Sequence, residues 1–205
     1  MIKLKNLEIG YNNHSVVKNL NWIFPENQIS IIKGPNGSGK TTLLKTICGI
    51  KKAMHGSVEY HEMFSSCESS YLPQMNKTNF DFPIRVFDFV SMGLLGKSLF
   101  FKIDRQRVSK ILSELGLDEH KNKYINELSG GLYQRCLFGR MILEDSRILL
   151  LDEPFNFLDE SNKFFLSNLI KRLAKDKTIL MVLHDIEDMA IFNANIYDLK
   201  EFRTI

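Results

Sequence analysis

The pattern of hydrophobic and polar residues predicts two kinds of β-strand in this chain. The segments 2–9 and 16–23 alternate polar and apolar residues, which is typical of antiparallel strands with one solvent-facing side. Two further short strands are expected at 57–60 and 69–72, and residues 55–57 favour a turn before the first of them. The alternating segments 2–9 and 16–23 therefore predict an antiparallel β subdomain.

Continuous apolar runs predict the second kind of strand, which is buried on both faces of a sheet. These runs are 28–33, 148–151 and 178–183. Helical periodicity follows each of them, at 39–49, 160–174 and 186–192. Buried strands that alternate with helices indicate a parallel sheet covered on both sides, so we expect an α/β core.

The middle of the chain, at about 75–145, has the apolar spacing of helices instead. Its clearest helix lies between Asp104, which we expect to be the N-cap, and Gly116, which we expect to follow the last turn. The buried stripe of that helix is expected to comprise Val108, Ile111, Leu112 and Leu115. We infer one domain with an α/β core at about 1–74 and 146–205, interrupted by this helical subdomain.

Composition agrees with one globular domain of 205 residues, since apolar residues make up 44% and charged residues 25%. The net charge of +3 is too small to indicate a nucleic-acid-binding surface, so no nucleic acid is expected as a partner. Cys48, Cys67 and Cys136 are far apart and odd in number, so we expect small buried thiols in a reducing compartment rather than a disulfide framework. No apolar run approaches the roughly 18 residues that a membrane helix needs.

The segment between the first buried strand and the helix at 39–49 carries a phosphate-binding sequence. It matches G-x-x-x-x-G-K-S/T in full, in the strand–loop–helix context that the motif requires. Glycines let successive backbone N–H groups point inward around an anion, and the following helix adds its positive end. We expect Lys40 to reach the β- and γ-phosphates of ATP and the Thr41 hydroxyl to bind Mg²⁺. The predicted phosphate-site residues are Gly34, Pro35, Asn36, Gly37, Ser38, Gly39, Lys40, Thr41 and Thr42.

An acidic pair follows the buried strand at 148–151. In a P-loop protein, a hydrophobic strand that ends in an acid carries the Asp that supports Mg²⁺, so we predict this role for Asp152. The adjacent Glu153 is expected to polarise a water molecule for attack on the γ-phosphate. A polar strand end without chemistry is the alternative, and the accompanying P-loop argues against it.

Residues 128–135 resemble the signature of ATP-binding cassette (ABC) proteins, which begins LSGGQ. With the P-loop and the acidic pair in the family's order, the sequence resembles the ATP-binding subunits of ABC transporters over nearly its whole length. The resemblance implies a P-loop NTPase core of the RecA-like type. It also implies that Ser129, Gly130 and Gly131 bind the γ-phosphate held by a second copy of the chain. The fifth signature position, usually Gln, is Leu132, which is expected to affect turnover more than nucleotide binding.

The resemblance implies roles for several isolated residues. Tyr11 lies where the family has an aromatic side chain that stacks on adenine, although a Tyr after a strand is often a packing residue. Gln74 matches the glutamine that contacts Mg²⁺ and the attacking water. His184 matches the histidine that contacts the γ-phosphate and holds Glu153 in place. Asp159 lies in the segment that crosses the dimer interface, and it is equally a candidate helix N-cap.

The resemblance also implies partners: a second copy of the chain, an integral-membrane permease and, indirectly, a substrate-binding protein. The ATPase is then expected on the cytoplasmic face of the cell membrane. The stretch 80–90 and Phe155 resemble the corresponding segments in the ATP-binding subunits of importers of zinc, manganese and iron chelates. Metal import is therefore expected. A stand-alone ABC ATPase with a regulatory or nucleic-acid-linked role is the alternative. Phe80, Phe82, Phe87, Phe89 and the run Leu99-Phe100-Phe101 make the insert strongly aromatic, and some of these rings are expected to line the permease-docking groove.

Overall fold

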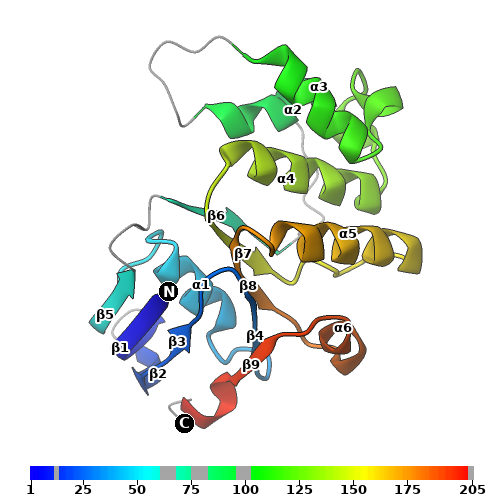
Figure 1. Cartoon of the computed structure of the whole chain (residues 1–205). Coiled ribbons are helices and arrows are strands. Elements are labelled where there is room, and N and C mark those ends of the chain that lie inside the picture. Colours follow the sequence, from blue (N-terminus) through cyan, green and yellow to red (C-terminus); the bar gives the residue numbers. More distant parts are fainter. Residues whose placement is uncertain (12–13, 61–67, 75–82, 96–102, 203–205) are drawn as a thin grey trace. The chain divides into compact units, whose positions relative to one another are not determined.

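A computed structural model describes residues 1–11, 14–60, 68–74, 83–95 and 103–202. The chain divides into two compact units, which are coloured along the sequence in Figure 1. The first unit comprises Met1–Gln74, Arg147–Pro154 and Ser167–Ile205. The second unit comprises Met75–Ser146 and Phe155–Leu166.

The first unit contains an antiparallel sheet built around β1 (Ile2–Tyr11). The strands that pair with β1 are β2 (His14–Leu20), β3 (Ile23–Phe24) and β5 (His55–Tyr60). The apolar residues of β1 are buried while Lys5 is exposed, because successive side chains of a strand point to opposite faces. The antiparallel subdomain is therefore present, as the alternating pattern predicts.

The second sheet of this unit is parallel, with the strand order β6-β7-β8-β4-β9. Every residue of β7 and β8 is buried, which explains their continuous apolar sequences. Asp152 pairs with Val182 in the ladder, so the carboxyl ends of β7 and β8 lie together, and β8 also pairs with β4. The strands are β4 (Ile29–Lys33), β6 (Ser69–Leu72), β7 (Ile148–Asp152), β8 (Thr178–Val182) and β9 (Asn195–Asp198).

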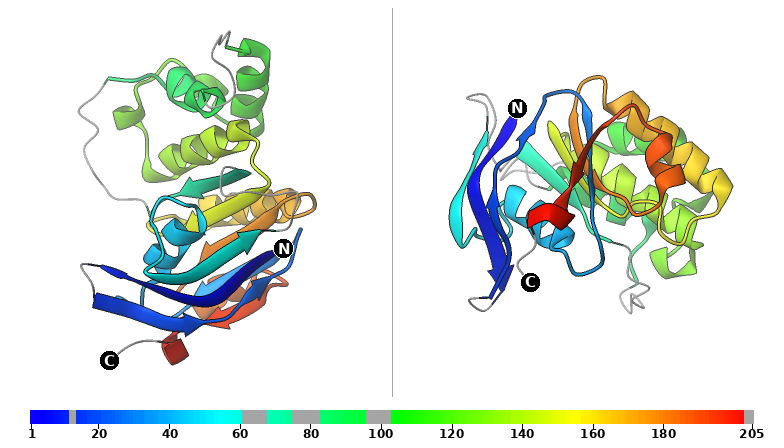
Figure 2. Two further views of the ribbon diagram at one scale, coloured as in Figure 1. Left: turned by 90° about the vertical axis from the view of Figure 1, so that its left-hand side faces the viewer. Right: turned by 90° about the horizontal axis from the view of Figure 1, so that it is seen from below.

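Helix α1 (Lys40–Ile47) packs between the two sheets of this unit (Figure 2). Its side chains Leu43, Leu44 and Ile47 are fully buried in one hydrophobic core with residues of β1, β4, β7 and β8. Burying one such side chain contributes about 1.5–3 kcal/mol. Core packing therefore fixes both elements that flank the predicted phosphate loop, which are β4 and α1. The shorter helix α6 (Ile186–Ala190) follows β8 in the same unit.

Three details of the strand prediction are wrong. The segment 16–23 forms two strands, β2 and β3, which are separated at residues 21–22, where the Asn21 side chain accepts a hydrogen bond from Asn6 N and donates one to Asn19 O. Residues 55–57 belong to β5 rather than to a turn. Gly56, with φ of 76°, lies so close to β1 that an added Cβ would be 2.3 Å from Asn6 O. Strand β9 was not predicted, since this edge strand of 4 residues lacks an apolar run.

The second unit is helical. As predicted, Asp104 caps α3 (Arg105–Glu114), because its Oδ1 accepts a hydrogen bond from Arg107 N (3.0 Å), and Gly116 follows the helix with φ of 65°. Gly93 packs on α4 (Gly130–Glu144), where an added Cβ would lie 2.0 Å from Arg140 O. The described α-helices are α2 (Val86–Ser91), α3 (Arg105–Glu114), α4 (Gly130–Glu144) and the first part of α5 (Glu160–Leu173). Short 3₁₀ segments occur at Met92–Leu94, Asp118–His120, Ile125–Glu127 and, in the first unit, Leu199–Phe202.

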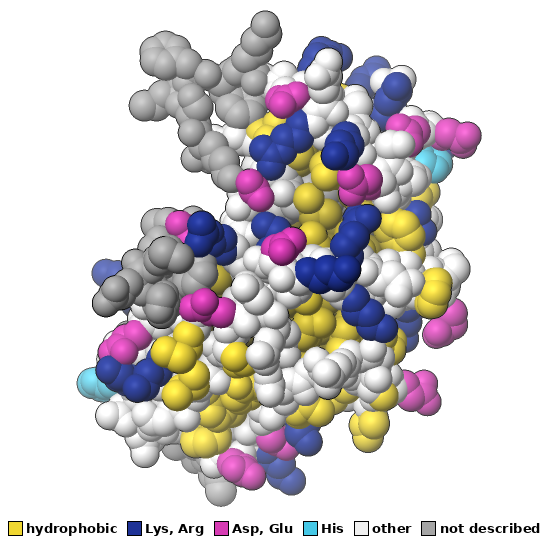
Figure 3. Space-filling view, in the orientation of Figure 1, with side chains coloured by type: hydrophobic (Ala, Val, Ile, Leu, Met, Phe, Trp, Pro, Cys, Tyr) yellow, Lys and Arg dark blue, Asp and Glu magenta, His cyan; other side chains and the backbone are white. Residues whose placement is uncertain are grey.

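The structure describes two of the residues that were expected to line the permease-docking groove, Phe87 and Phe89. Phe89 is 6% exposed and packs against the ring of Tyr133, so it is a core residue rather than part of a docking surface. Phe87 is half-buried. Among the described residues of the helical segment 75–146, Leu95 is the most exposed large apolar side chain, at 59%. On the face shown in Figure 3, Lys and Arg side chains are interspersed with Asp and Glu side chains over this unit. The remaining predicted residues, which are Phe80, Phe82, Leu99, Phe100 and Phe101, lie outside the described residues.

Two of the three cysteines, Cys48 and Cys136, lie in the described ranges. Cys136 is buried as expected, whereas Cys48 is only half-buried and its Sγ accepts a hydrogen bond from the Ser69 hydroxyl (3.4 Å). Cys67 lies outside the described residues.

In the parts of the chain that the structure describes, no helix combines the length and hydrophobicity needed to cross a bilayer.

Candidate functional site

The predicted phosphate loop connects the buried strand β4 to helix α1. Gly39, which precedes α1, has φ of 96°, a conformation that L side chains rarely adopt. An added Cβ there would also lie 3.2 Å from Val16 and Val17. No side chain caps α1, and its first turn has no acidic residue. The first N–H groups of α1 therefore remain available to an anion, and the helix dipole favours one there.

Lys40 folds back over this loop. Its Nζ donates hydrogen bonds to Gly34 O (2.8 Å) and Pro35 O (2.9 Å), and the residue is 6% exposed. Burial lowers the pKa of the Lys40 ammonium, although the nearby Glu153 and Asp152 carboxylates act to raise it. The loop thus presents a poorly solvated cation, whose attraction to phosphate is stronger than it would be in bulk water.

Asp152, at the end of β7, is the buried carboxylate of the site, with 1% exposure. Its Oδ2 accepts a hydrogen bond from the Tyr71 hydroxyl (2.9 Å), and the Thr41 hydroxyl also hydrogen-bonds to the carboxylate. Its Oδ1 is buried and has no hydrogen-bond partner among the described residues. Burial raises the pKa of Asp152, and the bonds from Thr41 and Tyr71 oppose that rise. A buried carboxylate oxygen without a partner, next to a hydroxyl on α1, fits the ligand set that Mg²⁺ prefers.

Glu153 contacts two other predicted catalytic residues. It has φ of 50°, a left-handed conformation that costs about 1–3 kcal/mol for a residue other than Gly. Its N–H donates to Val182 O (3.2 Å), which fixes the turn after β7. One oxygen of its carboxylate accepts a hydrogen bond from Gln74 Nε2 (2.5 Å), and the other contacts His184 Nε2. The structure therefore brings Glu153, Gln74 and His184 together.

Tyr11 lies at the end of β1, beside helix α1. Its side chain is 49% exposed, and its hydroxyl accepts a hydrogen bond from Thr42 Oγ1 (2.9 Å). The ammonium of Lys51 lies 3.5 Å from the centroid of its ring. An exposed ring with one edge fixed to α1 fits either a base-stacking or a cation–π role. The predicted contact with adenine stays a prediction.

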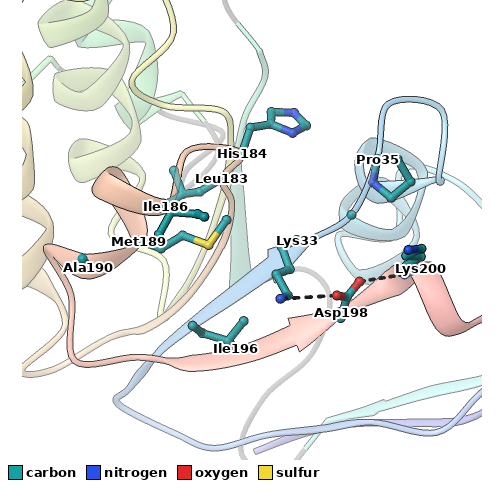
Figure 4. Close-up of a pocket in the computed structure, with 11 residues that line it drawn as sticks. Lys33, Pro35, Leu183, His184, Ile186, Met189, Ala190, Ile196, Asp198 and Lys200 are labelled. Atoms are coloured by element: carbon teal, nitrogen blue, oxygen red, sulfur yellow. Dashed lines mark hydrogen bonds and ion pairs between the residues drawn. The ribbon is translucent and has the colours of Figure 1, made fainter.

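A cavity of about 590 Å³ lies on one side of the phosphate loop (Figure 4). The side chains of Leu183, Ile186, Met189 and Ile196 make much of its wall apolar. An ion pair between Lys33 Nζ and Asp198 Oδ2 (3.3 Å) crosses its floor. Gly34, Pro35 and His184 also line it, so this cavity shares a wall with the predicted ATP site.

The predicted signature residues belong to the second unit, at the start of α4. Ser129 is the N-cap, and its Oγ accepts a hydrogen bond from Leu132 N (3.4 Å). Ser129 and Gly130 are exposed, whereas Gly131 is buried. Asp159 caps α5: its Oδ1 accepts a hydrogen bond from Asn162 N (2.8 Å), which confirms the capping alternative for this residue.

Sequence reasoning missed three residues of these sites. Tyr71 lies in the expected strand 69–72 without any sign of a role, yet its hydroxyl donates to Asp152, which is 81 positions away in the sequence. Lys51, which covers the Tyr11 ring, follows α1 without any local pattern that marks it. Asn162 contacts both the cap of its own helix and the helix that begins at the signature. Each of these contacts depends on the fold, and periodicity carries no signal for it.

The sequence matches a known family over most of its length. The family model described as ABC transporter covers residues 17–156, and the chain belongs to that family. The resemblance that rested on the P-loop and the signature is thereby confirmed.

Three relatives have similarity over nearly the whole chain. A metal transport system ATP-binding protein of Thermotoga maritima is 38% identical, over 91% of this chain and 75% of the relative. The manganese transport system ATP-binding protein MntB of Halalkalibacterium halodurans is 34% identical, over 91% and 77%. The zinc transport system ATP-binding protein TroB of Treponema pallidum is 33% identical, over 92% and 74%.

Solved structures agree with this family assignment. An inward-facing ABC transporter of the metal-chelate type superposes with a TM-score of 0.83 at 26% identity, covering 98% of this chain and 79% of that one. The dimeric structure of the bacterial ABC transporter cassette MJ0796 superposes with a TM-score of 0.82 at 26% identity, covering 98% and 95%. The predicted α/β fold class of a P-loop ATPase is confirmed.

Proposed function

We propose that this chain is the ATP-binding and ATP-hydrolysing subunit of an ABC transporter, and that it powers import of a metal ion or metal chelate. One observation carries the ATPase assignment. At the carboxyl end of β7, Asp152 contacts Thr41 of α1 while Glu153 contacts Gln74 and His184. A buried ligand for a cation and an oriented base thus lie side by side next to the phosphate loop.

ATP binding uses the loop and the first turn of α1. The backbone N–H groups of residues 34–41 surround the β- and γ-phosphates, which the dipole of α1 also attracts. Lys40 exchanges its carbonyl acceptors, Gly34 O and Pro35 O, for phosphate oxygens. Ser38 Oγ is buried and has no hydrogen-bond partner among the described residues, so it is a further donor for a phosphate oxygen. Tyr11 is the proposed stacking surface for adenine.

Thr41 and Asp152 are the proposed ligands of Mg²⁺, with Gln74 contributing from the end of β6. The ion supplies positive charge that neutralises the β- and γ-phosphates. Tyr71 holds Asp152 Oδ2, which leaves Oδ1 for the cation. This arrangement supports the proposed metal site through the chemistry of its oxygen donors.

Hydrolysis requires an oriented water molecule. Glu153 is the proposed base, since its carboxylate lies beside the phosphate loop and is held at both oxygens. Gln74 and His184 restrict the orientation of this carboxylate, which lowers the entropic cost of reaching the reactive geometry. Lys40 stabilises negative charge that develops on the phosphate oxygens.

The second half of the site comes from a second copy of the chain. Residues 1–205 form one ABC ATPase domain in this proposal, and the helical unit carries the signature. Ser129 and Gly130 are exposed at the N-terminus of α4, where N–H groups attract anions. The match to a dimeric cassette supports a pair in which the signature of each copy closes the ATP site of the other.

The transported cargo is inferred from the relatives. The three relatives are named as ATP-binding proteins of manganese, zinc and unspecified metal transport systems. None of these names indicates a stand-alone regulatory ATPase. In this proposal the chain associates with a membrane permease on the cytoplasmic face. A substrate-binding protein delivers the metal to that permease.

The test is reconstitution with the cognate permease. The tagged chain is purified from membranes of its own organism, the retained membrane subunit is identified by mass spectrometry, and the complex is placed in liposomes. ATP-driven uptake of Mn²⁺, Zn²⁺ or a ferric chelate is expected, and it should be lost in Lys40→Ala. Retention of no membrane protein, or ATP hydrolysis without uptake of any of these metals, would contradict the proposal.

A further inference from the structure

One side-chain amide connects the signature helix to the start of α5 within the second unit. Asn162 Oδ1 accepts a hydrogen bond from Arg135 Nε of α4 (3.0 Å). Asn162 Nδ2 donates to both carboxylate oxygens of Asp159, at 3.0 Å each. An amide has one acceptor group and one donor group, and here each contacts a different element. Asn162 therefore bridges α4 and the segment that ends at Asp159.

Gly131 lies directly against this amide. A Cβ added to Gly131 would be 2.3 Å from Asn162 Nδ2 and 2.8 Å from its Oδ1, closer than real Cβ atoms approach. Gly131 is the second residue of α4, where Gly costs about 1 kcal/mol relative to Ala. Space for Asn162 therefore gives a physical reason for this glycine that is separate from phosphate binding.

Arg135 is itself held at several points, so the bridge is rigid. Its Nη1 donates to Leu115 O (3.2 Å), and its guanidinium lies 4.0 Å from the centroid of the Phe165 ring. The Asp159 end is equally well defined. The hydrogen bonds from the Asn162 backbone and the Ser161 hydroxyl lower the pKa of Asp159, which favours its charged, accepting form.

We propose that Asn162 is a positioning residue for the ATP-dependent dimer, which fixes the start of α4 against the segment ending at Asp159. Ser129 and Gly130 then meet the nucleotide of the partner copy together with that segment, as one surface. The compact second unit includes both Phe155–Leu166 and the signature, which agrees with this coupling. The inference rests on the proposed dimer with shared ATP. Asn162 does not take part in binding ATP to the P-loop of its own copy.

A double-mutant cycle tests this role, with Gly131→Ala and Asn162→Ala made in the Glu153→Gln background. Ultracentrifugation gives the dissociation constant of the ATP-dependent dimer, and calorimetry on dilute protein gives the Kd of one copy for Mg-ATP. Each single substitution is expected to weaken the dimer about tenfold. The double variant should be no weaker than Gly131→Ala alone, because removal of the amide makes room for the added methyl group. The Kd of one copy for Mg-ATP should stay within about twofold.

Asn168→Ala is the matched control, since Asn168 is exposed on the same helix. It should leave the dimer unchanged. If the loss of dimer affinity in the double variant equals the product of the two single losses, the inference is overturned, because Gly131 would then act independently of Asn162. Equal losses in dimer formation and in Mg-ATP binding by one copy would also overturn it, since they indicate a general structural defect. Failure of the Glu153→Gln protein itself to dimerise with ATP would instead contradict the proposed function.

Discussion

Gln74 Nε2 donates a hydrogen bond to Glu153 Oε2 over 2.5 Å, although the two residues are 79 positions apart. The other oxygen of the same carboxylate contacts His184. The carboxylate of the proposed base is thus held from two sides by residues that follow two different strands, β6 and β8. Its orientation depends on the parallel sheet as a whole.

Replacing Gln74 by Ala should slow turnover more than it weakens ATP binding. The substitution removes one of the two groups that orient Glu153, and general-base catalysis contributes about 10²–10⁴-fold in enzymes. We expect kcat to fall at least about tenfold while KM for ATP changes less than about threefold. Phosphate release measured over a range of ATP concentrations separates the two. Gln106→Ala, at an exposed position of α3, is the control, and an unchanged kcat in Gln74→Ala would contradict the role.

Replacing Tyr71 by Phe should destabilise the protein and impair its use of Mg²⁺. The change removes the hydroxyl that donates to Asp152 Oδ2 (2.9 Å) and leaves a buried carboxylate less satisfied. Loss of a bond to a buried charged group costs about 1–3 kcal/mol. Urea denaturation should show a decrease of that size in the free energy of unfolding, and ATPase activity should require more Mg²⁺. Unchanged stability together with unchanged Mg²⁺ dependence would show that this bond is unimportant.

The parts of the site that follow a local motif were predicted from sequence. The P-loop, Asp152 and Glu153 each lie at the end of a buried apolar strand, and parallel strands bring such ends to one edge of the sheet. The helix from Asp104 to Gly116 was predicted for a similar reason, because its cap and its periodicity are both local.

The parts that depend on long-range contacts were not predicted. Strand β9 is defined by its pairing with β4, and Ile196, at its centre, is 55% exposed, so no apolar run marks it. Gly56 was expected in a turn, but it lies in a strand. A glycine is required at this position because the backbone of Asn6 in another strand approaches it closely. The role of Tyr71 follows from its distance to Asp152, which only the folded chain defines.

The thiol of Cys136 should resist alkylation in the folded protein. Burial raises the pKa of this thiol from 9.0 to about 12, so almost no thiolate is present near pH 8. Mass spectrometry after iodoacetamide treatment should find Cys136 unmodified until the protein is unfolded in urea. Rapid labelling under native conditions would contradict its burial.

The same shift in pKa gives stability a defined pH dependence. Between pH 9.0 and about 12 the unfolded chain loses the thiol proton while the folded chain keeps it, so stability falls as pH rises through this window. Cys136→Ala should therefore lose less stability than the unsubstituted protein between pH 9 and about 11, as measured by Tm. Parallel curves for the two proteins would contradict this assignment.

Changing Leu132 to Gln should alter turnover modestly and leave ATP affinity intact. Leu132 is half-buried, and its backbone N–H donates to the capping Ser129 hydroxyl, so the substitution keeps the backbone donors at the start of α4. Calorimetry with Mg-ATP and steady-state phosphate release measure the two properties. A large loss of ATP affinity would show that residue 132 is not the fifth signature position.

The most direct test of the shared ATP site is the oligomeric state of Glu153→Gln with and without Mg-ATP. This substitution removes the proposed base but keeps the shape of the side chain and the binding groups around it. Light scattering coupled to size-exclusion chromatography should show a monomer without nucleotide and an ATP-retaining dimer with it, and Lys40→Ala added to it should abolish the dimer. A protein that stays monomeric with bound ATP, or that hydrolyses ATP at the unsubstituted rate, would contradict the account.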